Sequence, residues 1–372
     1  MEQARALLVL VRAGLPAALL RGLLETHRTP AAVLAAGVPA WRDAGVAASV
    51  RAALRRPDAA RLRADLAWLA AGPRHLLGWH DADFPALLRA VPDPPPALFV
   101  EGEPACLWHP QVAIVGSRRA SPGGIDTARA FARGFGLAGL AVTSGLAAGI
   151  DTAAHRGALD AGTPTIAVVA TGLDIVFPRA NTALAARIAG TGAVVSEYPP
   201  GTDARAGQFP ARNRLIAGLS LGTLVVEAAE RSGALITARL AGESGREVFA
   251  VPGSIQNPMA RGCHRLIRQG VALVETPDEV MAALGPVAAS LGNALRRRLG
   301  VARPPSRAFA TAANDGEPAD KRVLVALGFE AVNLDQLAGR TGLTVATLAP
   351  MLLAMELDGR VIAENGRYVR RT

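Results

Sequence analysis

Between residues 111 and 285, short apolar runs alternate with longer segments of helical composition. Seven runs have the length and branched residues of buried strands: 112–115, 140–143, 165–169, 193–196, 223–227, 247–250 and 271–274. This alternation is typical of βαβ units, which build a parallel sheet covered by helices on both faces. We therefore predict an α/β fold, with ligands bound beyond the carboxyl ends of the strands.

The loop after the first predicted strand has the composition of an anion site. Gly116, Ser117, Arg118 and Arg119 follow the strand, and Pro122 stands where a helix begins. The first N–H groups of a helix and its dipole favour an anion, and arginine adds paired donors for phosphate. The loop therefore predicts a phosphate site, which belongs either to a small nucleotide or to a nucleic-acid backbone.

Similar turns follow two other predicted strands. Ser144 and Gly145 end one strand, and Ser232 and Gly233 open a helix after another. Glu227 ends the strand before Ser232, and we expect it to hold an arginine of the site in place. These turns predict further walls of the same pocket.

Arginines mark two more positions near predicted helix starts. Arg212, Asn213 and Arg214 follow Phe209, which either stacks on a base or belongs to the core, and Arg179 follows the strand at 165–169. Because the carboxyl ends of parallel strands meet at one edge of a sheet, we expect these side chains to lie around one pocket.

Asp151 and His155 lie one helical turn apart and resemble an acid–base or metal pair. No third ligand has suitable spacing, so we expect structural roles for both. The sequence contains no paired carboxylates, catalytic triad or metal set. We therefore predict no catalytic residues, no metal and no cofactor.

The net charge indicates what kind of partner the protein binds, and the two cysteines indicate its cellular compartment. The 372 residues carry 40 Lys and Arg against 31 Asp and Glu, a net charge of +9 that suggests an anionic partner. Lys321 is the only lysine, so a general bias towards arginine explains part of this excess equally well. Cys106 and Cys263 stand far apart, which favours a reducing cytoplasm. We see no signal peptide and no apolar run of about 18 residues, so we expect no membrane insertion.

The flanks of the predicted sheet have different compositions. Residues 1–72 read as short helices, 73–110 as a proline-rich connector packed on the core, and 286–320 as a linker. In 321–372, three helices (321–328, 333–341 and 344–357) precede a hairpin, which is the pattern of a winged helix.

Several short motifs stand in order between residues 98 and 275. They include Val115-Gly116-Ser117-Arg118, Ser144-Gly145-Leu146-Ala147, Thr171-Gly172-Leu173-Asp174, Ser196-Glu197-Tyr198-Pro199, Phe209-Pro210-Ala211-Arg212-Asn213-Arg214, Ser232-Gly233 and Val251-Pro252-Gly253-Ser254. With these motifs the chain resembles the DprA/Smf family of DNA-processing proteins.

The resemblance implies an extended Rossmann-like domain between an N-terminal helical domain, similar to SAM or helix-hairpin-helix domains, and a C-terminal winged helix. It implies a homodimer that binds single-stranded DNA, protects incoming strands and loads the RecA recombinase during natural transformation, with single-strand-binding protein as a further candidate partner. Ser117 and Arg118 would hold phosphate and Arg179 the strand. The residues that would line the same pocket are Ser144, Gly145, Arg212, Asn213, Arg214, Ser232 and Gly233.

Two other functions compete with this one. Nucleotide-phosphate hydrolases on this type of fold carry a Pro-Gly-Gly-x-Gly-Thr-x-x-Glu signature, but Pro122-Gly123-Gly124 continues differently, and no Gly-x-x-x-x-Gly-Lys is present. A winged-helix transcription regulator reads bases with Arg, Lys, Asn or Gln, whereas Glu356 is the only charge in 344–357. We therefore expect a binding protein rather than an enzyme.

Overall fold

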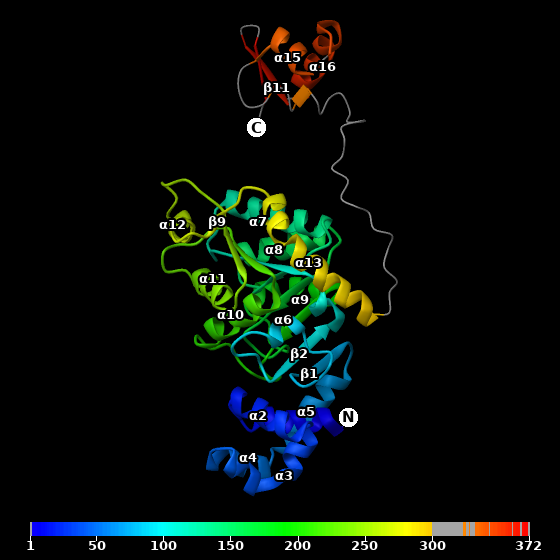
Figure 1. The fold of residues 1–372 in the computed structure, drawn as a ribbon, viewed down its shortest axis with the longest axis vertical. Helices are drawn as coiled ribbons and strands as arrows, with labels where there is room; N and C mark the ends of the chain where they lie inside the picture. The colour runs from blue at the N-terminus through cyan, green and yellow to red at the C-terminus, as the bar shows by residue number, and fades with distance from the viewer. Residues whose placement is uncertain are drawn as a thin grey trace. The chain divides into compact units, whose positions relative to one another are not determined.

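The chain divides into two compact units, residues 1–302 and 303–372. The computed structural model describes residues 2–299, 323–324, 327, 332–341, 343–358, 360–364 and 367–370. The first unit combines N-terminal helices with a nine-stranded sheet, and the second carries a three-stranded sheet with helices (Figure 1).

Short helices form the N-terminal part of the first unit, as the sequence predicts. They are α1 (Glu2–Arg12), α2 (Ala17–His27), α3 (Pro30–Asp43), α4 (Ala48–Arg55) and α5 (Ala59–Ala70). Thr29 and Asp58 accept hydrogen bonds from the first N–H groups of α3 and α5, which fixes where these two helices begin. Leu8, Leu10 and Leu20 are completely buried, and they belong to an apolar cluster that these helices share with the sheet and with α9 (Thr182–Thr191).

The sheet contains every predicted strand. Its strands are β1 (Arg74–Gly78), β2 (Ala97–Gly102), β3 (Gln111–Val115), β4 (Ala141–Ser144), β5 (Thr165–Val168), β6 (Ala193–Ser196), β7 (Gly222–Val225), β8 (Glu247–Ala250) and β9 (Ala272–Leu273). The order across the sheet is β1-β2-β6-β5-β4-β3-β7-β8-β9. The strands from β3 to β9 run parallel, so their carboxyl ends share one edge.

The segment 73–110 differs from the irregular connector that we expected. It supplies β1 and β2, which pair with each other and join the sheet antiparallel at β6. The cluster of prolines just before β2 hides the strand in the sequence, although Leu98, Phe99 and Val100 are fully buried, which agrees with a segment packed on the core. The predicted parallel sheet thus has two antiparallel strands at one edge.

Helices cover both faces of the sheet (Figure 1). On one face, α7 (Pro122–Leu137), α8 (Ile150–Asp160) and α13 (Pro277–Leu299) bury an apolar cluster. On the other, α6 (Ala86–Arg89), α10 (Gln208–Leu219), α11 (Gly233–Glu243) and α12 (Arg261–Arg268) bury a second. The helix α9 (Thr182–Thr191) packs on β2, β5 and β6, and its buried residues belong to the same apolar cluster as those of the N-terminal helices. Helix α13 continues through residues 286–299, so the first part of the expected linker is helical, and residues 300–320 lie outside the described residues.

The second unit has the predicted helices and hairpin of a winged helix. Its described elements are β10 (Val332–Asn333), α15 (Leu334–Thr341), α16 (Val345–Leu357), β11 (Val361–Glu364) and β12 (Arg367–Arg370), with strand order β10-β12-β11. Of the predicted helix 321–328, the structure describes Val323, Leu324 and Leu327, all three buried. Across the described parts of both units, no helix combines the length and apolarity needed to span a membrane.

Candidate functional site

A pocket of about 580 Å³ lies beyond the carboxyl ends of β3, β4 and β7. Seven of the predicted site residues line it: Gly116, Arg118, Phe209, Arg212, Asn213, Ser232 and Gly233. They come from the loop after β3, from the first turns of α10, and from the loop after β7 that leads into α11. The sheet therefore gathers residues that stand up to 117 positions apart, from 116 to 233, as the pattern of parallel strands predicts.

Arg212 is the buried cation of this pocket. Only 4% of the residue is exposed, and its Nη1 donates to the carbonyl oxygens of Gly145, at 2.8 Å, and Val168. Burial lowers the pKa of Arg212 to about 10, although the nearby carboxylate of Asp151 opposes this shift. The guanidinium is thus fixed against the ends of β4 and β5 and remains a cation at neutral pH.

Gly145 makes room for Arg212 and Asp151. A Cβ atom at this position would lie 2.7 Å from Nη2 of Arg212 and 2.8 Å from Oδ2 of Asp151. The backbone N–H groups of Gly145 and Ala147 donate to the same Asp151 oxygen, at 3.1 and 3.3 Å. Burial raises the pKa of Asp151, while Arg212 and these donors oppose the shift. Asp151 therefore holds the turn after β4, in agreement with the structural role that we expected.

Arg118 forms the exposed side of the pocket. Its guanidinium carbon lies 5.4 Å from the ring centre of Phe209, within the range of a cation–π contact. The ring of Phe209 in turn lies 5.5 Å from that of Phe177, which is 47% exposed. The positive charge of Arg118 further lowers the pKa of Arg212. Two arginines thus face one space, bordered by two partly exposed aromatic rings.

The helix that starts at this pocket is α11. Ser232 caps it by accepting a hydrogen bond from the N–H group of Ala234, at 3.3 Å, and Ser232, Gly233 and Ala234 all line the pocket. The positive end of the α11 dipole therefore adds to the charges of Arg118 and Arg212. Asn213 reaches the same turn, since its Nδ2 donates to the Gly233 carbonyl at 3.4 Å.

The start of α7, where the sequence predicts a phosphate, holds a carboxylate of the protein itself. Oε2 of Glu227 accepts from the Ser121 N–H group at 2.9 Å, and Oε1 accepts from the Ser121 hydroxyl at 2.6 Å. Asn257 donates to the same Oε1 at 3.0 Å. The expectation that Glu227 holds an arginine is therefore wrong: it holds Ser121, the N-cap residue of α7, because β3 and β7 are neighbours in the sheet.

Ser117 and Ser144 are used within the protein. The Ser117 N–H group donates to the Glu227 carbonyl at 2.7 Å, and its hydroxyl accepts from the Arg119 N–H group at 3.0 Å. The hydroxyl of Ser144 is fully buried and donates to the Ile114 carbonyl at 2.6 Å. Both serines fix the loops that carry the pocket, and neither is among the residues that line it.

Arg214 points away from the pocket. Its Nη2 pairs with Oε2 of Glu197, and its Nε lies 3.4 Å from Oδ2 of Asp93. Successive side chains of an α-helix point about 100° apart, so those of Arg212 and Arg214, two residues apart, point in nearly opposite directions. Arg119 and Arg179 are exposed and lie outside the pocket lining.

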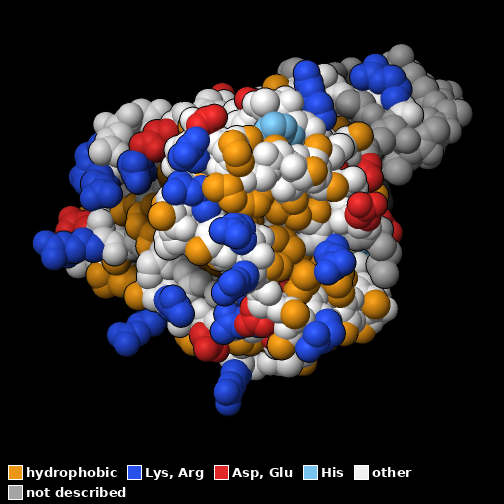
Figure 2. All heavy atoms as spheres, turned by 90° about the horizontal axis from the view of Figure 1, so that it is seen from below, with side chains coloured by type: hydrophobic (Ala, Val, Ile, Leu, Met, Phe, Trp, Pro, Cys, Tyr) orange, Lys and Arg blue, Asp and Glu red, His pale blue; other side chains and the backbone are white. Residues whose placement is uncertain are grey.

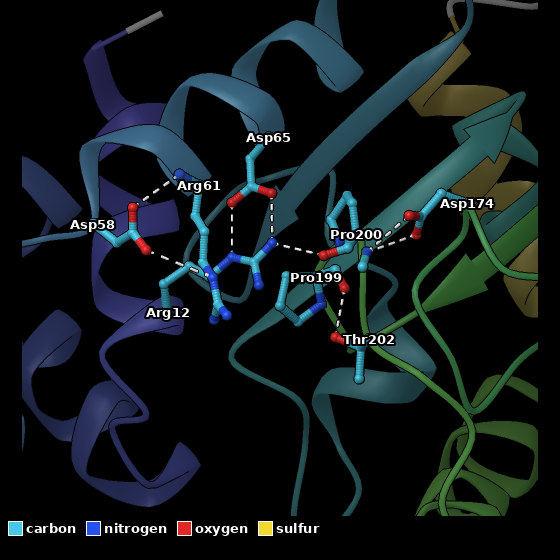
Figure 3. Close-up of polar contacts among 9 residues, drawn as sticks. Arg12, Asp58, Arg61, Asp65, Asp174, Pro199, Pro200 and Thr202 are labelled. Atoms are coloured by element: carbon cyan, nitrogen blue, oxygen red, sulfur yellow. Dashed lines mark hydrogen bonds and ion pairs between the residues drawn. The ribbon is translucent and has the colours of Figure 1, made fainter.

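The loop between β6 and α10 is anchored from two sides (Figure 3). Arg12 on α1 donates to the Pro200 carbonyl at 2.7 Å and also pairs with Asp65 on α5. Asp174 accepts from the Gly201 N–H group at 2.8 and 2.9 Å. Because this loop leads into α10, the N-terminal helices help to place the segment that carries Phe209 and Arg212.

Some pocket residues were not among the predicted ones. Phe177 and Ala147 line the pocket, as do Pro210 and Thr237. Phe177 stands two residues before Arg179, and Ala147 and Pro210 lie within the motifs on which the family resemblance rests. Among the described residues, no group of three or more His, Cys, Asp and Glu side chains is arranged to hold a metal ion.

Arginine dominates the charge of the surface. Figure 2 shows blue side chains spread over one face among apolar patches, with acidic side chains between them. Since Lys321 is the only lysine and lies outside the described residues, these blue side chains are all arginines. Any phosphate that binds a cationic side chain on this face therefore meets the planar guanidinium group of arginine, which can bind phosphate through two parallel hydrogen bonds.

Comparisons with known proteins agree with this architecture. Residues 75–285 match the family model of DNA recombination-mediator protein A, and residues 307–367 match that of the DprA winged helix domain. Protein Smf of Escherichia coli (strain K12) is 41% identical over 310 residues, which cover 83% of this chain and 80% of that protein. DNA processing protein DprA of Streptococcus pneumoniae is 46% identical over 202 residues, 54% of this chain and 71% of that one.

Solved structures give the same result. The X-ray structure of DNA processing protein A from Streptococcus pneumoniae has a TM-score of 0.68 at 36% identity and covers 76% of this chain and 99% of its own. A structure of DNA processing protein A from Helicobacter pylori, described for its single-stranded DNA binding mode, has a TM-score of 0.52 at 28% identity and covers 58% and 97%. With matches over both the sheet domain and the winged helix, this chain belongs to the DprA/Smf family.

Proposed function

We propose that this chain binds single-stranded DNA in the pocket at the carboxyl ends of β3, β4 and β7. The observation that carries the proposal is the placement of Arg118 and Arg212 around one space, next to the positive end of α11. Phosphate is the anion that suits this arrangement. The rings of Phe209 and Phe177 supply apolar faces on which bases stack.

The binding is expected to be insensitive to base sequence and sensitive to salt. Phosphate contacts carry no base identity, and neutralising phosphates releases counterions. A relative from Helicobacter pylori, 28% identical to this chain, is described for its single-stranded DNA binding mode, which supports a strand rather than a nucleotide as the guest. Arg119 and Arg179, exposed outside the pocket, would contact the strand beyond it.

The direct test is a titration of fluorescently labelled oligothymidine with wild-type protein and with Arg118→Ala at several salt concentrations. We expect the variant to lose about tenfold or more in affinity, and the slope of log K against log salt to become shallower by about 0.7. Arg187→Ala, which removes an exposed arginine of α9, is the matched control and should bind as wild type does. Unchanged binding by folded Arg118→Ala would overturn the assignment.

We further propose that the protein acts as a homodimer that delivers DNA to the RecA recombinase during transformation and protects the incoming strand. The support is family membership. The test measures RecA filament formation on DNA coated with single-strand-binding protein. Wild-type protein should accelerate it and Arg118→Ala should not; no acceleration by wild-type protein would refute the delivery role while leaving DNA binding intact.

Binding without hydrolysis is part of the same proposal. The start of α7, which would hold a nucleotide phosphate, is occupied by the carboxylate of Glu227. A bound nucleotide would have to displace this carboxylate and meet its charge. Turnover of nucleoside monophosphates by purified protein, with and without added divalent metal, would contradict this part of the proposal.

A further inference from the structure

The excess of positive charge in this chain is distributed unevenly. Residues 73–285, which form the sheet and carry the pocket, contain eighteen arginines and eighteen acidic residues. Residues 1–72 contain ten arginines against five acidic residues, so the N-terminal helices have a net charge of +5. A general bias towards arginine acts on the whole chain and does not explain a difference between its parts. The N-terminal helices therefore carry a local charge that is separate from the pocket.

This charge is densest where α4 ends and α5 begins. Residues 51–63 include five arginines and a single acidic residue, Asp58. The five, called here the α4–α5 surface, are Arg51, Arg55, Arg56, Arg61 and Arg63. Figure 2 views the molecule from the end at which α3 and α4 lie in Figure 1, and arginine side chains are more common than acidic ones on that face.

Most of the α4–α5 surface is open to solvent and to a ligand. Arg55, Arg56 and Arg63 are exposed and form no ion pair with any residue that the structure describes. Arg61, with a 72% exposed side chain, lies 3.6 Å from Asp58. The Asp58 carboxylate also caps α5, where it accepts from two N–H groups at 3.0 and 3.1 Å. Three cations of this surface thus have no internal use, and the one nearby anion is already engaged.

The N-terminal helices offer no aromatic ring to a base. Trp41 and Trp68 are the only aromatic residues in 1–72. Trp41 is buried, and its Nε1 donates to the Val33 carbonyl at 2.7 Å. The ring of Trp68 packs edge-on against Phe99, at 6.3 Å between ring centres, and the guanidinium of Arg74 lies 4.7 Å from its centre. Single-strand binders stack bases on such rings, whereas the bases of a duplex are stacked on one another.

We infer that the α4–α5 surface binds the phosphate backbone of double-stranded DNA. A duplex carries one negative charge per about 1.7 Å of its axis, so it is a denser partner for several arginines than a single strand is. Arginine binds phosphate through two parallel hydrogen bonds, and phosphate contacts read no base. None of the five arginines lines the pocket, so one chain can hold a single strand and a duplex at separate places.

The test measures the affinity of the whole chain for a labelled duplex of about 20 base pairs, close to two helical turns, and for oligothymidine. The variant replaces three arginines together: Arg55→Ala, Arg56→Ala and Arg63→Ala. Arg51, which donates to the Val46 carbonyl, and Arg61, which pairs with Asp58, stay in place.

A charge-matched control makes the same change of net charge elsewhere. It replaces three exposed arginines of α7, α8 and α9 that do not line the pocket: Arg133→Ala, Arg156→Ala and Arg187→Ala. Urea denaturation shows whether each protein is folded. Vesicles of phosphatidylserine, which present another anionic surface, are titrated in parallel.

We expect the α4–α5 variant to lose about tenfold or more in affinity for the duplex, and its salt slope to become shallower by about 2.7, for three lost phosphate contacts. Its affinity for oligothymidine should stay that of wild type, because the pocket is unchanged. Arg118→Ala should show the reverse, with weaker binding of oligothymidine and normal binding of the duplex. The control should bind both forms of DNA as wild type does.

Four outcomes would overturn the inference. They are no duplex binding by wild-type protein, no loss of duplex affinity in the folded α4–α5 variant, an equal loss for both forms of DNA, and a loss confined to vesicle binding, which would make a membrane the partner. If wild-type protein binds the duplex but not oligothymidine, the proposed function fails and this inference stands, so the two failures are distinguishable.

Discussion

Arg214 and Glu197 form an ion pair beside the pocket rather than within it, with side chains only 19% and 14% exposed. Burial raises the pKa of Glu197, and the charge of Arg214 opposes this shift. Asp93 extends the pair, since Arg214 lies 3.4 Å from it, and Arg21 on α2 lies 3.2 Å from its other oxygen. A line of charges therefore connects α10 to the N-terminal helices.

Replacing Arg214 by alanine should destabilise the protein by about 2–4 kcal/mol, because Glu197 would remain buried without its partner. Replacing Arg118 by alanine should leave stability within about 0.5 kcal/mol, since Arg118 is exposed. Urea denaturation measures both values. If the Arg214→Ala protein is as stable as wild type but has lost affinity for DNA, Arg214 contacts DNA directly and the prediction is wrong.

The Arg12–Asp65 ion pair should contribute more to the free energy of unfolding than the Arg61–Asp58 pair, although both lie in the same part of the structure (Figure 3). Asp65 has a 2% exposed side chain, so Arg12→Ala leaves a buried charge unpaired and should cost about 3 kcal/mol. The side chains of Arg61 and Asp58 are 72% and 58% exposed. Arg61→Ala should therefore cost less than about 1 kcal/mol.

Thermal and urea unfolding of the two variants check this difference. Arg12→Ala should also weaken DNA binding modestly, because it frees the Pro200 carbonyl and the loop into α10. Equal destabilisation by the two variants would contradict the importance of burial at Asp65.

Gly145→Ala should impair both folding and binding. The added Cβ would lie within 3 Å of Arg212 and Asp151, so the guanidinium would have to move away from the turn. We expect a loss of about 1–3 kcal/mol in stability, with weaker DNA binding. Gly190→Ala, in α9, is the control, because no atom lies within 4 Å of its added Cβ. Binding and stability of Gly145→Ala equal to those of this control would show that the turn accommodates a side chain.

His155 should make the protein acid-sensitive. Its Nδ1 lies 2.8 Å from the Thr165 hydroxyl, which donates its own proton to the Val142 carbonyl, so Nδ1 is the donor in this hydrogen bond. Burial, reinforced by the charge of Arg212, lowers the pKa of His155 from 6.5 to about 3. Below pH 6.5 the unfolded chain takes up a proton at this residue that the folded protein does not.

The free energy of unfolding should therefore fall as the pH drops below 6.5, and the contribution of His155 approaches about 1.4 kcal/mol per pH unit. Urea denaturation between pH 7.5 and 4.5 measures this slope. His155→Gln should reduce it, whereas His75→Gln, at an exposed position, should leave it unchanged. Parallel pH profiles for wild type and His155→Gln would contradict the assignment.

Part of the fold and of the site can be predicted from the sequence alone. It predicts the strands β3 to β9, the helix starts and the gathering of Arg118, Arg212 and Ser232 at one edge of the sheet. These features follow from local sequence patterns, because the spacing of apolar residues, helix-capping residues and turn glycines all act on neighbouring residues of the chain. It misses β1 and β2, whose strand character appears only when β6 offers an edge to pair with.

What the sequence by itself determined is therefore the doubly covered sheet and the cationic character of its ligand-binding edge. The tertiary structure decided which charges face the pocket and which are used internally. Glu227 holds Ser121 at the start of α7 because β7 lies next to β3, and Arg214 meets Glu197 because a helix turns its side chains by about 100° per residue. Arg118 lines the pocket as predicted, whereas Arg214 forms an ion pair with Glu197 beside the pocket. Strand order and side-chain direction depend on contacts between distant segments, so local sequence patterns do not reveal them.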